Sequence, residues 1–514
     1  MTHRCLAPLL HNPIIRRNGK NWLRRKALCI SLNYRSIFLL DQTADLTGIE
    51  KMIDLELGEE IAKKALGSTG AYSDVIFQRR TITHIKFEDG KVDDVSVGLD
   101  SGAGVRVIRG DLAAYAHTDL VDRDNLTRAA LAASEALKHA SGGTPLNVRA
   151  SKREGTSQPV CPAGEGAAEI RRLVDHLSAC DESARSLGKE IRQVTAVHMG
   201  YREKELLVNS LGEVRQGTCQ RTRLVVQVVA SRDGVIQVGQ EAPGSLSGPD
   251  FYRMTEPAEV AARAARRVLT MLDARPAPTG KMPVVLNSGT GGVLLHEACG
   301  HGFEVDHVHK GASVYAGKIG ERVANTVVSA ADDPTIPALW GSYDFDDEGT
   351  PSGETVLIEE GILKGYLYGR HEAMKDDRES TGNGRRQSFR FSPVPRMSNT
   401  YIKPGDTVPE DILASTRRGL YARKMGGGQV DPVTGDYVFS VSEGYLIENG
   451  KLGPAARGAV LIGNGPRTLE MIDAVGNDLS FEEGTCGKDG QGVPVTTGCP
   501  TFRISELTVG GTEQ

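Results

Sequence analysis

The sequence has no run of 18 or more apolar residues in its 514 positions. A helix that crosses a bilayer needs about 20 consecutive apolar residues, so the sequence offers no candidate for one. The formal net charge is −5 and the isoelectric point is near 6.2. This balance lacks the strong charge that favours nucleic acid or membrane surfaces. We therefore expect neither a nucleic acid nor a membrane as a partner.

Cysteine is scarce, and its eight residues are widely spaced along the chain. At that density a disulfide framework is not expected, and mostly free thiols in a reducing compartment are expected. We therefore predict a cytoplasmic protein in which any functional cysteine is catalytic or metal-bound. The eight are Cys5, Cys29, Cys161, Cys180, Cys219, Cys299, Cys486 and Cys499.

Acidic residues are absent before Asp41, whereas arginine is frequent in the same stretch. An arginine-rich, acid-free start resembles an organellar transit peptide. The alternative, which we favour, is that translation begins at Met52, after which the composition becomes balanced. Under either interpretation residues 1–51 are an N-terminal extension, disordered or misassigned, that takes no part in the fold.

Glycine is abundant, with 60 residues against an average share of about 7%. The hydrophobic content of 39% and the charged content of 25% are typical of a globular protein. Such frequent glycine favours tight turns and hairpins over long helices. The length allows roughly two to four domains of about 100–200 residues each.

Helical and strand-like patterns both occur in the first half of the chain. They predict an N-terminal α+β domain over residues 52–280, with a linker near 141–165 that divides it into two possible subdomains. A hairpin turn is expected at 88–91, where glycine supplies a positive φ. The predicted helices are 55–66, 122–140, 167–187 and 256–272, and the predicted strands are 74–77, 81–87, 92–97, 105–108, 193–199, 205–208 and 223–230.

Short strands and glycine turns dominate from residue 281 to the end. A buried strand is predicted at 281–286, and two hairpins at 355–366 and 444–460. These patterns predict a glycine-rich, β-dominated C-terminal domain over 281–514. The fold class expected for the whole chain is α+β, with mixed sheets that are rich in antiparallel pairs.

One segment of the C-terminal domain gathers groups that bind metals and move protons: His296, Glu297, Cys299 and His301. At about 100° per residue, the five steps between the histidines leave them roughly 140° apart on a regular helix. Both therefore reach one ion only if the helix contains a π-type bulge or ends near Gly300. We predict a distorted helix end at Gly300; two unrelated histidines are the alternative.

A catalytic zinc usually has three protein ligands and one open position. The third ligand is either Cys299, which lies three residues after His296, or Cys486, which lies far along the chain. Lys488 lies near Cys486 and would favour its thiolate form. Glu297, next to a ligand, is the candidate general base and then proton donor to the leaving amine.

The motif and several later segments resemble the TldD/PmbA family of metalloproteases. Residues 296–302, 344–349, 381–386, 395–397, 426–431 and 486–488 occur in the same order in TldD-type proteins. The resemblance covers about 283–512 strongly and extends through weaker motifs to about Met52. It implies a zinc peptidase in which His296, His301 and Cys486 bind Zn²⁺ and Glu297 is the catalytic acid and base.

The resemblance also implies partners for the chain. TldD-type proteins cleave unfolded or small peptides in a chamber between subunits, so peptides are the expected substrates. The expected assembly is a homodimer or a heterodimer with a PmbA/TldE-type subunit that lacks the metal motif. Two alternatives remain: a thiol hydrolase that uses Cys486, and a non-catalytic subunit that binds peptides or assists assembly.

Four further groups of residues receive weaker predictions. The acidic run 344–348 is expected to pair with Arg385 and Arg386 rather than to bind a cation. Residues 426–428 form either a plain loop or an edge where a peptide adds as a strand. His371 and Glu372 are expected at the surface. Candidates for oxyanion stabilisation are Arg396 and Tyr401.

Overall fold

The computed structural model of the protein describes residues 55–511, except 69, 140–145, 150–165 and 432. The predicted extension over 1–51, the alternative start at Met52 and most of the predicted linker at 141–165 lie outside the described residues. Within them, helices pack on several largely antiparallel sheets, which confirms the α+β fold class. None of the described helices is long and apolar enough to cross a membrane.

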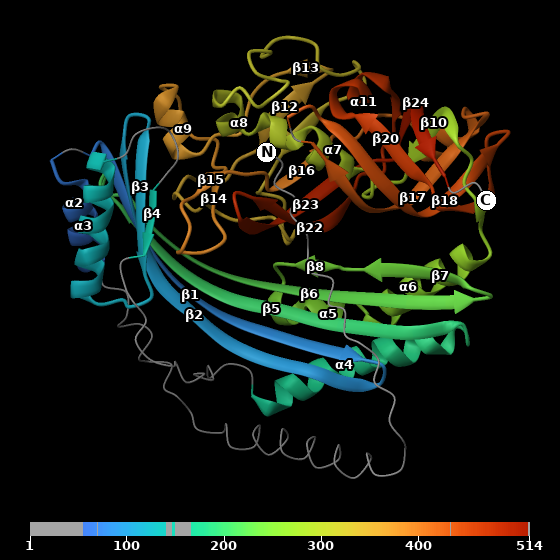
Figure 1. Cartoon of the computed structure of the whole chain (residues 1–514), viewed down its shortest axis with the longest axis horizontal. Helices are drawn as coiled ribbons and strands as arrows, with labels where there is room; N and C mark the ends of the chain where they lie inside the picture. Colours follow the sequence, from blue (N-terminus) through green and yellow to red (C-terminus); the bar gives the residue numbers. More distant parts are fainter. Residues whose placement is uncertain (1–54, 69, 140–145, 150–165, 432, 512–514) are drawn as a thin grey trace.

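The first sheet has eight strands, and its four central strands are very long and curved (Figure 1). Their order across the sheet is β2, β1, β5, β6, with every neighbouring pair antiparallel. The four are β1 (Tyr72–Glu88), β2 (Lys91–Arg109), β5 (Ile191–Asn209) and β6 (Val214–Arg232). The others are β3 (Leu112–Thr118), β4 (Leu146–Arg149), β7 (Val235–Glu241) and β8 (Gly244–Ser245).

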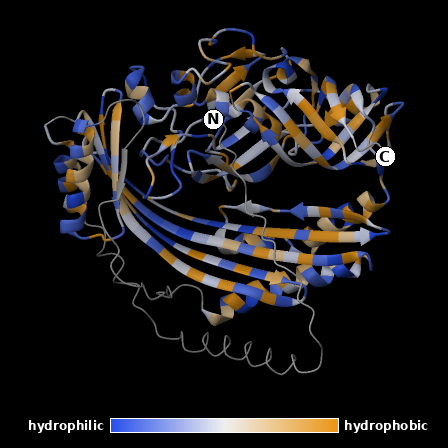
Figure 2. Cartoon of the chain, viewed as in Figure 1, coloured by the Kyte–Doolittle hydropathy of each residue, from blue (hydrophilic) through white to orange (hydrophobic). Residues whose placement is uncertain are grey.

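These strands are longer than the sequence predicts, because each runs through polar residues that looked like breaks. The predicted strands at 74–77 and 81–87 are one strand, β1. Between them, Gln78 accepts a hydrogen bond of 2.9 Å from the backbone nitrogen of Phe389, and Arg80 pairs with Glu203. Polar residues therefore continue the strand because other parts of the chain satisfy them. Figure 2 shows the resulting mixture of hydrophilic and hydrophobic positions along these strands.

Two pairs of helices cover one face of this sheet, at opposite ends. In β1, Val75 and Phe77 pack with the first pair, and Ile85 and Phe87 with the second. These residues are an even number of positions apart, so their side chains lie on the same side of the strand. The first pair is α2 (Leu55–Leu66) and α3 (Arg123–His139), and the second is α4 (Ala167–Ser186) and α6 (Pro257–Leu272). A short segment, η3 (Gly248–Asp250) and α5 (Phe251–Met254), precedes α6.

The opposite face of the sheet holds the C-terminal half of the chain through buried arginines. Arg106 pairs with Asp74 on the neighbouring strand and with Glu348 of the C-terminal half, and all three are buried. Arg221 in β6 donates a hydrogen bond of 2.9 Å to the carbonyl oxygen of Trp340. The long sheet therefore serves as a platform for the C-terminal half.

In the C-terminal half, five strands pair in a closed ring, from β17 through β10, β24, β20 and β18 back to β17. Side chains from these strands, among them Val284, Leu461 and Ile504, belong to the largest hydrophobic core. The five are β10 (Gly280–Leu286), β17 (Arg418–Val430), β18 (Asp436–Glu448), β20 (Val460–Asn464) and β24 (Phe502–Gly510). Attached to them are β9 (Arg275–Pro276), β19 (Lys451–Arg457) and β21 (Ile472–Val475).

A six-stranded sheet lies beside this ring, and its strand β22 contains the candidate ligand Cys486. Its order is β13, β12, β11, β16, β23, β22. The strands are β11 (Ala330–Asp332), β12 (Thr355–Glu359), β13 (Ile362–Leu363), β16 (Asn399–Ile402), β22 (Ser480–Lys488) and β23 (Gln491–Cys499). A separate pair is β14 (Gly384–Arg385) and β15 (Val394–Pro395). Short helices complete this half: α8 (Val305–His309), α9 (Arg370–Lys375), α10 (Pro409–Ala414) and α11 (Gly465–Met471).

Candidate metal centre

The predicted metal-binding motif begins in helix α7 (Gly292–Ala298), which packs on β16 and β23. A Cβ atom at Gly292 would lie 2.5 Å from the backbone nitrogen of Gly498, so glycine allows the helix to begin close against β23. The regular helix ends at Ala298, because Cys299 has φ −131° and ψ −43°. The helix is therefore too short to hold both histidines.

After Cys299 the chain forms one turn of 3₁₀-helix, η4 (Gly300–Phe303). A Cβ atom at Gly300 would lie 2.2 Å from the Sδ atom of Met397, so a side chain here would displace that methionine. The prediction of a distorted helix end is confirmed. The distortion is a tightened turn, not the wider π-type bulge that was the other possibility.

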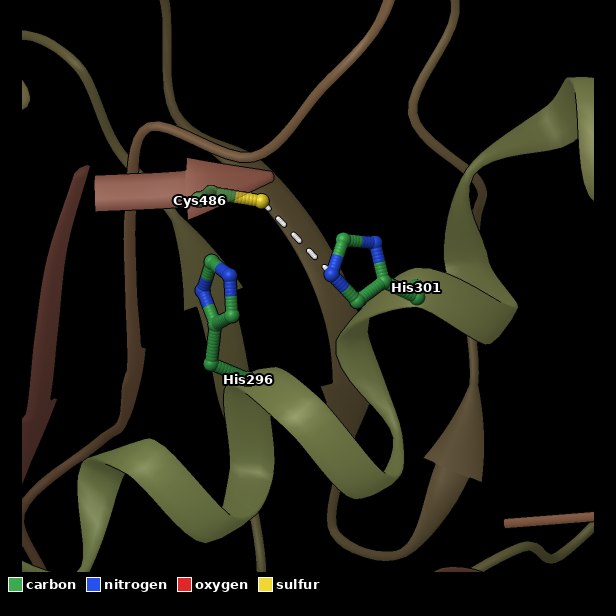
Figure 3. Close-up of side chains that lie close together, drawn as sticks. All are labelled: His296, His301 and Cys486. Atoms are coloured by element: carbon green, nitrogen blue, oxygen red, sulfur yellow. Dashed lines mark hydrogen bonds between the residues drawn. The ribbon is translucent and has the colours of Figure 1, made fainter. Parts of the chain in front are cut away.

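The distorted helix brings His296 and His301 together with Cys486 from the end of β22 (Figure 3). One donor atom from each residue lies within 4.8 Å of the others. The Sγ atom of Cys486 is 3.5 Å from Nε2 of His301, and the centroids of the two imidazole rings are 5.3 Å apart. All three side chains are buried. The three predicted ligands therefore form one compact cluster.

The cluster has two properties of a metal site: buried ligand atoms without a hydrogen-bond partner, and a suitable set of donor atoms. Both ring nitrogens of His296 are buried and have no hydrogen-bond partner within the protein. Leaving a buried polar group unsatisfied costs about 1–3 kcal/mol. Two imidazoles and a thiolate form a donor set that suits zinc, with a fourth position left for water or substrate. The residues present therefore fit a catalytic zinc ion.

Electrostatic interactions within the cluster favour the thiolate of Cys486. Burial raises the pKa of this thiol, but the adjacent His296 and His301 outweigh burial and lower it to about 5. Burial lowers the pKa of His296, while Cys486 raises it, with a net increase. Lys488, expected from the sequence to favour the thiolate, instead directs its Nζ atom to Glu304 and Asp306. The histidines therefore stabilise the thiolate, which is the form that binds zinc.

A buried charged group that the sequence prediction missed supports His301. Its Nδ1 atom lies 2.8 Å from Oε2 of Glu304, and Nζ of Lys488 lies 3.0 Å from the same oxygen. Burial raises the pKa of Glu304, but Lys488 and His301 outweigh burial and hold it well below its usual range. The only sequence signal was the three-residue spacing of His301 and Glu304, which places two side chains next to each other on a helical turn.

Glu297 is the one acidic side chain of the motif, and it is partly exposed. Its side chain is 38% exposed, and its Oε2 atom lies 4.0 Å from Nε2 of His301. It is therefore next to the three candidate ligands but in contact with solvent. This is the position that a group exchanging protons with a substrate requires.

Cys299, the other candidate for third ligand, lies outside the cluster. It is 1% exposed within the hydrophobic core, and burial raises its pKa to about 12. It behaves as a small buried apolar residue. All the described cysteines, Cys180, Cys219, Cys299, Cys486 and Cys499, are free thiols.

The acidic run at 344–348 is structural. Asp347 accepts a hydrogen bond of 2.8 Å from the backbone nitrogen of Arg386, and the Arg386 guanidinium donates to the backbone oxygen of Asp347. Arg385 does not pair with the run, because it donates to the carbonyl oxygens of Met397 and Pro494. Backbone and arginine partners therefore satisfy a group that superficially resembles a cation site.

One other prediction from the sequence is wrong. His371 and Glu372 were expected at the surface, but His371 is 5% exposed and the side chain of Glu372 is 12% exposed. Arg396, a candidate for oxyanion stabilisation, is fully buried and donates to the carbonyl oxygen of Cys486, and its role stays a prediction. The hydroxyl of Tyr401, the other candidate, lies 3.3 Å from Glu354.

The glycines at 426–428 have a packing role at two of the three positions. A Cβ atom at Gly426 would lie 2.3 Å from the hydroxyl of Ser440, and one at Gly428 would lie 2.1 Å from the ring of Phe439. Gly427 has open space around its Cα atom. Close packing between β17 and β18 therefore explains two of the three glycines.

Comparisons with known proteins identify the class to which this fold, with its cluster of two histidines and a cysteine, belongs. Family models match in three consecutive regions: PmbA/TldA metallopeptidase domain 1 at 73–137, the central domain at 165–272 and the C-terminal domain at 279–511. The protein is a metalloprotease. It belongs to the PmbA/TldD metallopeptidase family, as the sequence resemblance predicts.

Individual relatives agree with this assignment. The chain is 36% identical over 452 residues to the metalloprotease TldD homolog of Haemophilus influenzae, covering 86% of this chain and 93% of the relative. It is 25% identical to the zinc metalloprotease TldD homolog of Saccharolobus solfataricus, covering 87% and 98%. Its fold is similar to that of TldE from Thermococcus kodakarensis, with a TM-score of 0.70 and 20% identity over 88% of this chain and 100% of that one.

Proposed function

We propose that this protein is a zinc-dependent peptidase whose metal is held by His296, His301 and Cys486. The observation that carries the proposal is the buried cluster itself, in which both nitrogens of His296 lack a partner within the protein. The donor set supports zinc over magnesium or calcium, which prefer oxygen ligands. A relative named as a zinc metalloprotease gives the same support.

Glu297 is the proposed proton carrier for peptide hydrolysis. A zinc ion in this site would supply Lewis acidity, which polarises the scissile carbonyl and makes water a better nucleophile at neutral pH. Glu297 would accept a proton from the attacking water and deliver it to the leaving amine. Its partial exposure beside His301 lets its carboxylate reach a bound peptide.

The test of this role is the substitution Glu297→Gln, which keeps size and polarity but removes the basic carboxylate. We predict that peptide cleavage falls by about 10²–10⁴-fold, the usual contribution of general acid–base catalysis, while bound zinc is unchanged. Cleavage of a fluorogenic unfolded peptide and metal content would be measured together. The matched control is Glu359→Gln at the exposed end of β12, which should retain full activity. Unchanged cleavage by Glu297→Gln would contradict this role of Glu297.

The low pKa of Cys486 also permits the second candidate, a thiol hydrolase with a histidine base. Burial argues against it, because Cys486 is 2% exposed and its sulfur faces two buried imidazoles. A nucleophile has to reach the substrate carbonyl. Activity that survives complete removal of metal by a chelator would support the thiol mechanism; loss of activity that zinc restores supports the metal mechanism.

We further propose that the substrates are unfolded or small peptides and that the active form is a cytoplasmic dimer. The partner is either a second copy or a PmbA/TldE-type subunit. The similarity of fold to TldE supports a partner of related shape, and the free thiols support a reducing compartment. Light scattering of the purified chain, alone and mixed with a TldE-type protein, separates the two assemblies.

A further inference from the structure

The 3₁₀ turn η4 and the strand β22 supply the candidate ligands His301 and Cys486. Beside these ligands, charged side chains make a second contact between the two segments. Cys486 and Lys488 lie two residues apart near the end of β22, and both are buried. His301 and Glu304 lie three residues apart across the 3₁₀ turn. Cys486 faces His301 at 3.5 Å, and Lys488 faces Glu304 at 3.0 Å.

The geometry of the two elements explains why these contacts match. Residues two apart on a strand point to the same side and are separated by about 6.6 Å. Residues three apart on a 3₁₀ turn also lie on one side, about 6 Å apart along the axis. On a regular α-helix, residues three apart are also neighbours, but they lie about 60° apart around the axis. The tightened turn therefore aligns His301 and Glu304 opposite Cys486 and Lys488.

The hydrogen bonds then determine which nitrogen of His301 is free. The Glu304 carboxylate only accepts hydrogen bonds, so His301 donates its Nδ1 proton to Oε2 across 2.8 Å. The neutral ring consequently keeps its lone pair on Nε2, the atom that faces Cys486. In known metal sites, such a carboxylate fixes both the tautomer and the orientation of a histidine ligand.

Lys488 stabilises the charged form of the Glu304 carboxylate and also bonds the neighbouring Asp306. Its three ammonium protons have three acceptors: Glu304 at 3.0 Å, Asp306 at 2.6 Å and the carbonyl oxygen of Pro395 at 2.9 Å. Glu304, Asp306 and His307 are close enough together to hold a metal ion. The buried ammonium of Lys488 bonds both Glu304 and Asp306, so a cation of the protein itself already balances the charge of these two carboxylates.

We propose that Glu304 and Lys488 form a positioning pair that orients His301 and joins the strand of Cys486 to the histidine motif. The inference rests on the proposed function, since it takes His301 and Cys486 to be ligands. Glu304 fixes the nitrogen that His301 presents. Lys488 fixes the distance between the two ligand-bearing segments.

The test compares zinc affinity in the full-length protein and in Glu304→Gln, measured by competition with a chromophoric chelator. We predict that Glu304→Gln binds zinc about 10–100-fold more weakly, the usual effect of removing such a carboxylate. The matched control is Glu443→Gln, which removes a buried glutamate of β18. The carboxylate of Glu443 lies 3.0 Å from the Nε atom of Arg267 in α6. The control should change zinc affinity by less than about twofold, because its pair lies outside the metal centre.

Cobalt(II) supplies a readout that a general loss of stability would not change. The thiolate-to-cobalt absorption band and the visible bands of the substituted protein report ligand geometry. We predict that both shift in Glu304→Gln and stay unchanged in Glu443→Gln. Should Glu304→Gln fail to fold, Glu304→Asp keeps the charge for Lys488 but withdraws it from His301, and should weaken zinc in the same direction.

Three outcomes can be distinguished. Weaker zinc with altered cobalt bands in Glu304→Gln, or in Glu304→Asp, supports the positioning pair. About one tight zinc in the unmodified protein with the same affinity and spectrum in Glu304→Gln would overturn the pair and leave the proposed function standing. No tight zinc in the unmodified protein would overturn the ligand assignment, and the positioning pair with it.

Discussion

Residue by residue, the site shows which parts of a metal centre are visible in a sequence. His296, Glu297 and His301 stand out because they are adjacent and reactive, and the family resemblance adds Cys486. Glu304 was missed, because its role depends on a contact with a lysine 184 residues away. Lone charged residues acquire roles only through such contacts.

Glu372 gives a pH prediction at this scale. Burial, with help from Glu348, raises its pKa to about 7. The folded protein then holds a proton that the unfolded chain releases above about pH 4.5, so this residue lowers stability as pH rises toward and through 7. Glu372→Gln should be more stable than the unmodified protein at pH 8, by about 1–3 kcal/mol, with little difference at pH 5. Thermal melting at the two pH values checks this, and an equal shift at both would contradict it.

At the scale of elements, periodicity located the helices well and the strand lengths poorly. The helices α2, α3, α4 and α6 lie within a residue or so of their predicted ranges. The long strands β1 and β5 were predicted as fragments, because the polar residues within them meet partners from distant segments. The hairpins predicted at 355–366 and 444–460 are confirmed, and their turns have positive φ at Gly361 and Gly450. Local signals therefore locate turns, while tertiary contacts decide where a strand continues.

The helix end at Gly300 gives the prediction at this scale. Gly300→Ala places a Cβ atom 2.2 Å from Sδ of Met397, so either the methionine or the turn has to move. We expect the variant to lose most of its bound zinc and activity, because the turn positions His301 relative to His296. Gly427→Ala, with open space at its Cα atom, is the control and should retain zinc.

Recovery of zinc in Gly300→Ala combined with Met397→Ala would assign the effect to this contact. Metal analysis of the single and double variants makes the comparison. Full zinc content in Gly300→Ala alone would show that the tightened turn is not needed for binding.

At the scale of the whole molecule, buried charges join the long sheet to the half that contains the site. Glu348 and Arg106 are each 1% exposed and belong to different halves. Removing one partner of such a pair destabilises by about 3–5 kcal/mol, because the other charge stays buried. Glu348→Gln should therefore lower the melting temperature by several degrees. Glu506→Gln, which breaks an exposed pair with Lys281, should cost less than about 1 kcal/mol. Equal shifts in the two variants would contradict a structural role for the buried pair.

Zinc content tests the central claim, a metal centre built from His296, His301 and Cys486, most directly. Elemental analysis would compare the unmodified protein with Cys486→Ser and Cys299→Ser. The structure predicts about one zinc per chain in the unmodified protein and in Cys299→Ser, and almost none in Cys486→Ser. Zinc retained by Cys486→Ser and lost from Cys299→Ser would move the third ligand into the helix and contradict the assignment.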